Sequence, residues 1–179
     1  AACTTELIEP SYNLDGNGVV QLSSRVVPFS DRDVTTRANK NEAENKISSI
    51  DYLIFGSGDK CVFHQRVSSI DPLLVDKSSP VFEGVDLANC YIVSIANGPE
   101  LNIELGETTW DIISSQSIEV SGVSITSAGL PMVGRYPETG TFNFGGTNQG
   151  TVLTIPMKSL FAKIAFKLSV DAEEIRPGE

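Results

Sequence analysis

Few side chains in this sequence have the type and spacing that chemistry requires. The 179 residues hold one histidine, His64, so a Ser-His-Asp triad or a histidine-based zinc site would depend on it alone. Ser57 lies between two glycines but does not meet the Gly-x-Ser-x-Gly pattern of a nucleophile elbow. Asp15-Gly16-Asn17-Gly18 begins like a calcium loop and lacks the later carboxylates. The sequence therefore predicts no catalytic residues, no metal, no cofactor and no enzyme.

Cysteine is the other reactive residue type, and the chain has three. Ala1 and Ala2 directly precede Cys3, as small residues do at the end of a bacterial lipobox, which predicts lipidation of Cys3. An ordinary cysteine is the alternative. Cys61 and Cys90 could form a disulfide in an exported protein or act as small buried hydrophobic residues. We favour burial, because a chain of this length does not need a covalent bridge.

A polar segment, Ser30–Asn45, contains almost nothing apolar and predicts an exposed loop long enough to have a function. Arg37, followed by Ala38, lies near its middle, and Arg32 precedes it. An Arg-specific protease requires an exposed, extended segment of this kind. We therefore expect proteolytic processing between Arg37 and Ala38, with Arg32 as the alternative cleavage site. An ordinary surface arginine is the other interpretation.

Charge and length exclude several classes of protein. Lys and Arg number 13 against 23 Asp and Glu, a net charge of −10. Nucleic acid is excluded as a partner, because binding it requires a basic surface, and the same charge opposes binding to anionic lipid headgroups. No apolar run is long enough for a membrane-spanning helix. The length fits one full domain.

The elements that would position these residues are mostly strands. Alternating or continuous apolar residues predict strands at Val19–Val27, Lys46–Phe55, Lys60–Val67, Cys90–Ala96, Ile118–Ile125, from Pro131 onward, and Ala162–Val170.

In the first of these strands, Val20, Leu22 and Val26 share one face. We expect one short helix within Glu104–Ser115, anchored by Trp110, Ile112 and Ile113, and irregular chain over Asp71–Phe82. Short strands separated by turns predict an all-β, mainly antiparallel sandwich with one short helix.

Three groups of segments are distinctive when taken together. Thr36-Arg37-Ala38 precedes Glu44-Asn45-Lys46-Ile47 and the strand Ile50–Phe55. Leu130-Pro131-Met132 is matched by Thr154-Ile155-Pro156-Met157. A basic, alternating strand follows at Leu160–Leu168. The chain thereby resembles the fimbrillin superfamily of Bacteroidetes, the subunits and accessory proteins of type V pili. Ala1-Ala2-Cys3 agrees with this, because these proteins are exported as lipoproteins.

The resemblance implies a domain plan. Residues 1–18 would be a lipoprotein-like tether, and residues 19–170 a transthyretin-like Greek-key β-sandwich that forms the N-terminal domain. Residues 171–179 would be a linker toward a C-terminal domain that this chain does not include.

The resemblance also implies assembly by strand exchange. The displaced strand would carry Val19, Val20, Leu22 and Val26, and it would leave after cleavage at Arg37. A strand of the next subunit would then fill the groove. The implied partners are other pilus subunits, an Arg-specific protease, outer-membrane lipid through Cys3, and a host glycan or protein. The implied location is the outer membrane and cell surface, in a fimbrium, after export through the periplasm.

A cell-surface adhesin or glycan-binding module that does not polymerise is the alternative function. Its sugar platform would use exposed aromatic rings, and the candidates are Trp110, Tyr91, Tyr136 and Phe144. Packing of these rings in the core is the competing interpretation, and we favour it.

Overall fold

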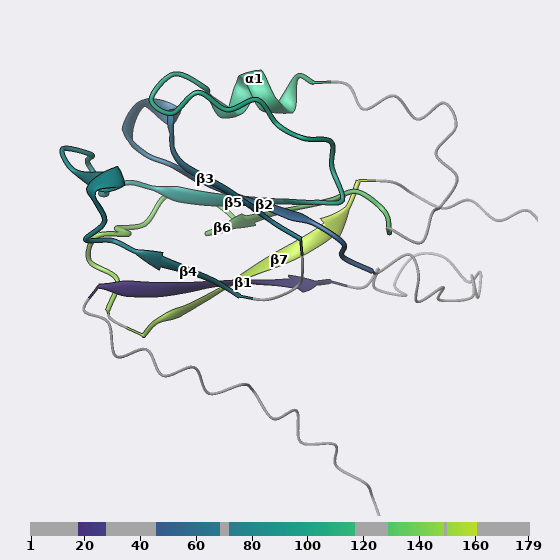
Figure 1. The fold of residues 1–179 in the computed structure, drawn as a ribbon, viewed down its shortest axis with the longest axis horizontal. Helices are drawn as coiled ribbons and strands as arrows, with labels where there is room; N and C mark the ends of the chain where they lie inside the picture. Colours follow the sequence, from purple (N-terminus) through teal and green to yellow (C-terminus); the bar gives the residue numbers. More distant parts are fainter. Residues whose placement is uncertain (1–17, 28–45, 69–71, 117–128, 149, 161–179) are drawn as a thin grey trace, which may run out of the picture.

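The computed structural model describes residues 18–27, 46–68, 72–116, 129–148 and 150–160 (Figure 1). Seven strands in this part form one sheet in the order β3-β2-β5-β6-β7-β1-β4. They are Val19–Val26 (β1), Ile50–Phe55 (β2), Cys61–Val67 (β3), Leu73–Asp76 (β4), Tyr91–Ala96 (β5), Met132–Tyr136 (β6) and Val152–Ser159 (β7). The only α-helix in these residues is α1, Trp110–Ser114. The expected all-β fold with one short helix is confirmed.

The sheet curves until its two ends form facing layers. Figure 1 shows β1 and β4 on one side of the molecule and β2, β3 and β5 on the other, with β7 passing between the two levels. All neighbouring strands are antiparallel except β1 and β7, which are parallel. The main core lies between the layers, and its completely buried side chains include Val20, Leu22, Ile50, Tyr52, Ile54, Ile92, Ile155 and Met157.

A second, smaller apolar cluster covers the opposite face of β2 and β5. Leu53 and Phe55 on β2 pack there with Val93 on β5 and Ile113 on α1. Because β2 lies between the two clusters, all six of its residues are buried, as its continuous apolar sequence predicts. The helix is shorter than expected and only part of the predicted anchor is correct, since Ile113 is buried but Ile112 is 53% exposed.

Two strands depart from the sequence-based expectation. β4 lies within Asp71–Phe82, where we expected irregular chain. Its four residues alternate between buried and exposed, as in a strand with one face on the core. β7 was not predicted as a strand, because Pro156 interrupts it. The Pro156 nitrogen faces β6 and has no proton to donate, and the ladder between β6 and β7 ends beside it, at Gly134 and Met157.

Several predicted segments lie outside the described residues. They are the strands at Ile118–Ile125 and Ala162–Val170, residues 1–17 of the tether, the whole of Ser30–Asn45, and the linker 171–179. In the part of the chain that is described, no helix has the length and apolar character needed to cross a membrane.

Candidate functional site

The candidate site is the position of β1 within the sheet. β1 lies between two strands, parallel to β7 and antiparallel to β4. Gln21 of β1, for example, pairs with Val152 of β7 on one side and with Leu74 of β4 on the other. β4 is the end strand of the described sheet, so β1 is its only neighbour there. The first strand of the fold is therefore an interior strand.

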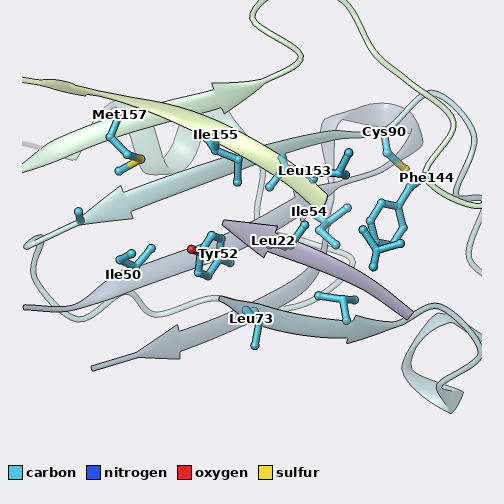
Figure 2. Close-up of a cluster of buried hydrophobic side chains, with 14 of the residues drawn as sticks. Leu22, Ile50, Tyr52, Ile54, Leu73, Cys90, Phe144, Leu153, Ile155 and Met157 are labelled. Atoms are coloured by element: carbon cyan, nitrogen blue, oxygen red, sulfur yellow. The ribbon is translucent and has the colours of Figure 1, made fainter. Parts of the chain in front are cut away.

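The inward face of β1 supplies part of the main core. Val20 and Leu22 are completely buried, and Val26 is half-buried and packs against the same cluster. Figure 2 shows Leu22 among Ile54 of β2, Leu73 of β4 and Leu153 of β7. The shared face predicted for Val20, Leu22 and Val26 is thus correct, whereas Val19 at the start of the strand is only partly covered.

Backbone hydrogen bonds hold both edges of β1. On the β7 side, the Gln21 N–H donates to the Thr151 carbonyl at 2.9 Å, and the Val27 N–H donates to the Met157 carbonyl at 2.8 Å. On the β4 side, the Lys77 N–H donates to the Gly18 carbonyl at 3.1 Å. Departure of β1 would leave two facing rows of unpaired backbone groups.

One polar residue on the inward face escaped the sequence analysis. Ser24 follows the same alternation as Val20 and Leu22 and is 8% exposed. Its hydroxyl donates to that of Ser94 on β5 at 3.3 Å. Period-two alternation alone places Ser24 inward, so the signal for this residue was present in the sequence. The other residues expected at the site, Cys3, Arg37 and Ala38, lie outside the described residues.

The single histidine belongs to a buried ion cluster on the hairpin of β2 and β3. The Asp51 carboxylate is 1% exposed, lies 2.9 Å from His64 Nε2 and accepts from Arg66 Nη1 at 2.9 Å. Arg66 also donates to the carbonyls of Gly98 and Pro99, both at 2.9 Å. Every group in this cluster has a structural partner, so the cluster clamps the hairpin to the chain that follows β5.

Cys61 and Cys90 are both free and buried. Cys61 belongs to the small cluster and Cys90 to the main core, on opposite faces of the sheet. Burial raises the pKa of each thiol to about 11. The favoured interpretation of these residues as small buried hydrophobic side chains is correct. Among the described residues, no group of three or more His, Cys, Asp or Glu side chains could hold a metal ion.

The four aromatic residues proposed as a sugar platform do not form one surface. Phe144 is completely buried in the main core, and Tyr91 is 6% exposed in the small cluster. Tyr136 packs at the main core, whereas Trp110 packs at the small one. The favoured interpretation, packing of these rings in the core, is therefore correct, because the sheet divides them between the apolar clusters on its two faces.

No family model matches the chain, and no curated protein matches it. Three solved structures have a similar fold. A fimbrial assembly protein from Parabacteroides distasonis is 11% identical over 81% of this chain and 53% of its own length, with a TM-score of 0.47. A candidate cell-adhesion protein from Bacteroides eggerthii is 12% identical over 79% of this chain and 40% of its own, with a TM-score of 0.45.

The third is a candidate polysaccharide-binding protein from Bacteroides thetaiotaomicron, 9% identical over 78% of this chain and 46% of its own, with a TM-score of 0.42. The chain spans about half the length of these proteins or less. At such identities and TM-scores the likeness concerns the fold and carries no conclusion about function.

Proposed function

We propose that this chain is a structural protein of a surface fimbria, either a pilus subunit or an accessory protein. It is exported as a lipoprotein and assembles by strand exchange after proteolysis. In this proposal β1 is a temporary occupant of the sheet. Cleavage in the segment that follows it allows β1 to leave, and a strand of another subunit takes its place.

The position of β1 carries the proposal. The strand is interior to the sheet, yet its only covalent connection to the other six strands runs through residues 28–45. Both arginines expected as cleavage sites, Arg32 and Arg37, lie in that connection. A single cut there converts β1 from a covalent part of the domain into a ligand held only by packing and hydrogen bonds.

The energies involved suit a strand that is held firmly and can be replaced. Full burial of Val20 and Leu22 contributes about 1.5–3 kcal/mol each, and each ladder hydrogen bond adds about 0.5–1.5 kcal/mol. Together these are comparable to the whole stability of a domain, about 5–15 kcal/mol. An emptied groove is therefore unstable and binds a replacement strand strongly.

Limited digestion of the full chain with an Arg-specific protease tests the proposal. Intact mass identifies the cut, and size-exclusion chromatography shows whether the fragment that contains β1 stays bound. We expect one early cut after Arg37, then release of β1 and growth of oligomers when a version of the chain extended by a donor strand is added. Arg37→Gln should abolish the early cut, and Arg32→Gln should not. A chain that resists cleavage, or that keeps the fragment and stays monomeric, would refute strand exchange and favour the non-polymerising adhesin.

The export step depends on Cys3 and is tested separately. Expression behind a lipoprotein leader in a bacterial host should yield a chain that partitions into detergent and labels with a fatty-acid analogue. Cys3→Ala should abolish both properties. Equal labelling of the two proteins would exclude the lipid anchor at Cys3 and leave the strand-exchange proposal intact.

A further inference from the structure

The main core contains a small polar cluster contributed by three strands. Ser24 lies on β1, Ser94 on β5 and Tyr52 on β2, and Tyr52 and Ser94 are direct partners in the register of β2 with β5. Ser94 and Tyr52 are completely buried, and Ser24 is 8% exposed. Ser24 is the only one of the three on the strand that is proposed to leave.

The hydrogen bonding of this cluster is incomplete without β1. The Ser24 hydroxyl is bonded to Ser94 Oγ at 3.3 Å. Among the described residues, Tyr52 Oη is the one buried side-chain polar atom with no hydrogen-bond partner. Burial raises the pKa of Tyr52. An apolar side chain in place of Ser24 would remove the hydrogen bond of the Ser94 hydroxyl and leave a second unsatisfied hydroxyl beside that of Tyr52.

On the basis of the proposed function, we propose that the groove of β1 selects a strand with a defined side-chain pattern. In the direction of β1, the pattern is two aliphatic residues two positions apart, followed two positions later by a small hydroxyl residue. Val20, Leu22 and Ser24 are the template for these three positions. The hydroxyl residue is the specificity determinant, and it acts through its hydrogen bond to Ser94.

The hydroxyl residue is needed because apolar alternation cannot fix the register of an incoming strand by itself. A slip by one residue turns every side chain to the wrong face, and the core excludes it. A slip by two residues keeps aliphatic side chains inward and is excluded only weakly. The polar cluster removes this ambiguity, because only one of the registers that keep Val20 and Leu22 inward places a hydroxyl against Ser94. A buried polar group that sets register in this way is well attested in other folds.

Peptide exchange into the cleaved full chain tests the inference. The chain is cut after Arg37 and incubated with fluorescent peptides of residues 18–27, and uptake is measured by anisotropy and size-exclusion chromatography. We compare the wild-type peptide with Ser24→Thr, Ser24→Val and Ser23→Val peptides. Thr and Val have the same shape, so this pair separates the hydroxyl from the size of the side chain. Ser23→Val makes a similar change on the outward face.

We expect the wild-type, Ser24→Thr and Ser23→Val peptides to bind within a few-fold of one another. The Ser24→Val peptide should bind about ten- to a hundredfold more weakly. In a Ser94→Ala chain this penalty should shrink, because the hydroxyl that valine leaves unsatisfied is no longer there. Equal binding of the Ser24→Val and Ser24→Thr peptides would overturn the inference and leave strand exchange standing. Failure of the wild-type peptide to enter at all would refute the proposed function, and this inference with it.

Discussion

Truncation of Leu22 measures how much β1 contributes to the fold. Leu22 is completely buried, and Figure 2 shows it among side chains from three other strands. Leu22→Ala removes these contacts and leaves a cavity that β2 and β7 cannot fill, because both strands are fixed by hydrogen bonds to neighbours on both sides. The expected loss is about 2–5 kcal/mol in the free energy of unfolding, a large part of a typical total of about 5–15 kcal/mol.

Leu74→Ala is the matched control for this variant. Leu74 of β4 pairs with Gln21 of β1, but its side chain points outward and is 49% exposed. The same chemical deletion there should cost less than about 1 kcal/mol, since little apolar surface is lost from the interior. The two variants delete the same atoms from neighbouring strands, one from the inward face of β1 and the other from the outward face of β4.

Urea unfolding followed by tryptophan fluorescence provides the assay. Trp110 is the single tryptophan of the chain. It packs edge-on against Phe55, 6.1 Å between ring centroids, in the cluster on the far side of β2 from β1. Its signal therefore reports unfolding of the domain rather than local loss of β1. With an m-value of about 2 kcal/mol per molar urea, Leu22→Ala should lower the urea midpoint by about 1–2.5 M. Equal midpoints for the two variants would mean that β1 is not part of the cooperative core, and the argument for an unstable empty groove would fail.

Further predictions concern the rest of the fold. Arg66→Ala should lower the free energy of unfolding by about 3 kcal/mol, because it removes the guanidinium that faces the buried Asp51 carboxylate; urea denaturation measures it, and a loss below about 1 kcal/mol, roughly that of a surface pair, would contradict the clamp. Cys61 and Cys90, whose pKa values burial raises to about 11, should react with a thiol reagent at pH 8 only as fast as the chain unfolds. Because the folded thiols hold their protons above the usual value of 9.0, their contribution to the free energy of unfolding should be constant below about pH 9 and fall toward pH 11; a stability that rose between pH 9 and pH 11 would contradict their burial. Gly134→Ala should lower the free energy of unfolding by about 1–3 kcal/mol, since the new Cβ would lie 2.5 Å from the Pro156 carbonyl oxygen. The control Gly145→Ala, whose Cβ would have no atom nearer than 3.4 Å, should leave the melting temperature almost unchanged.

The sequence predicted the strands whose pattern is decided locally. β2 and β5 are continuous apolar runs because both of their faces are buried. β3 followed from the turn at Gly56–Asp59, which forces the chain to return beside β2. β1 followed from alternation, which also gave its inward face correctly. These features depend on neighbouring residues only, and the sequence displays them directly.

The features that escaped prediction depend on distant parts of the chain. Four residues are too few to reveal β4 without knowledge that β1 lies beside it. β7 was not predicted because it contains Pro156, and proline cannot donate a backbone hydrogen bond within a sheet. In the folded sheet Pro156 lies where the pairing of β6 with β7 ends, so no hydrogen bond is lost, but the sequence does not show this position. The parallel pairing of β1 with β7 has no local signature at all, since alternation specifies a face and not a partner. The polar cluster at Ser24 needed both that pairing and the opposing layer.

The parallel pairing of β1 with β7 also dictates the order in which this domain can fold. Gln21 meets Val152, about 130 positions later in the chain. During synthesis the first strand emerges long before the strand against which it packs, and it must stay unpaired until β7 follows. Such long-range pairing makes folding slow and leaves apolar segments exposed in the meantime. The inward face of β1 therefore stays uncovered by β7 for most of the synthesis of the chain, and the sheet of the described residues is complete only after Ser159, the last residue of β7, has emerged.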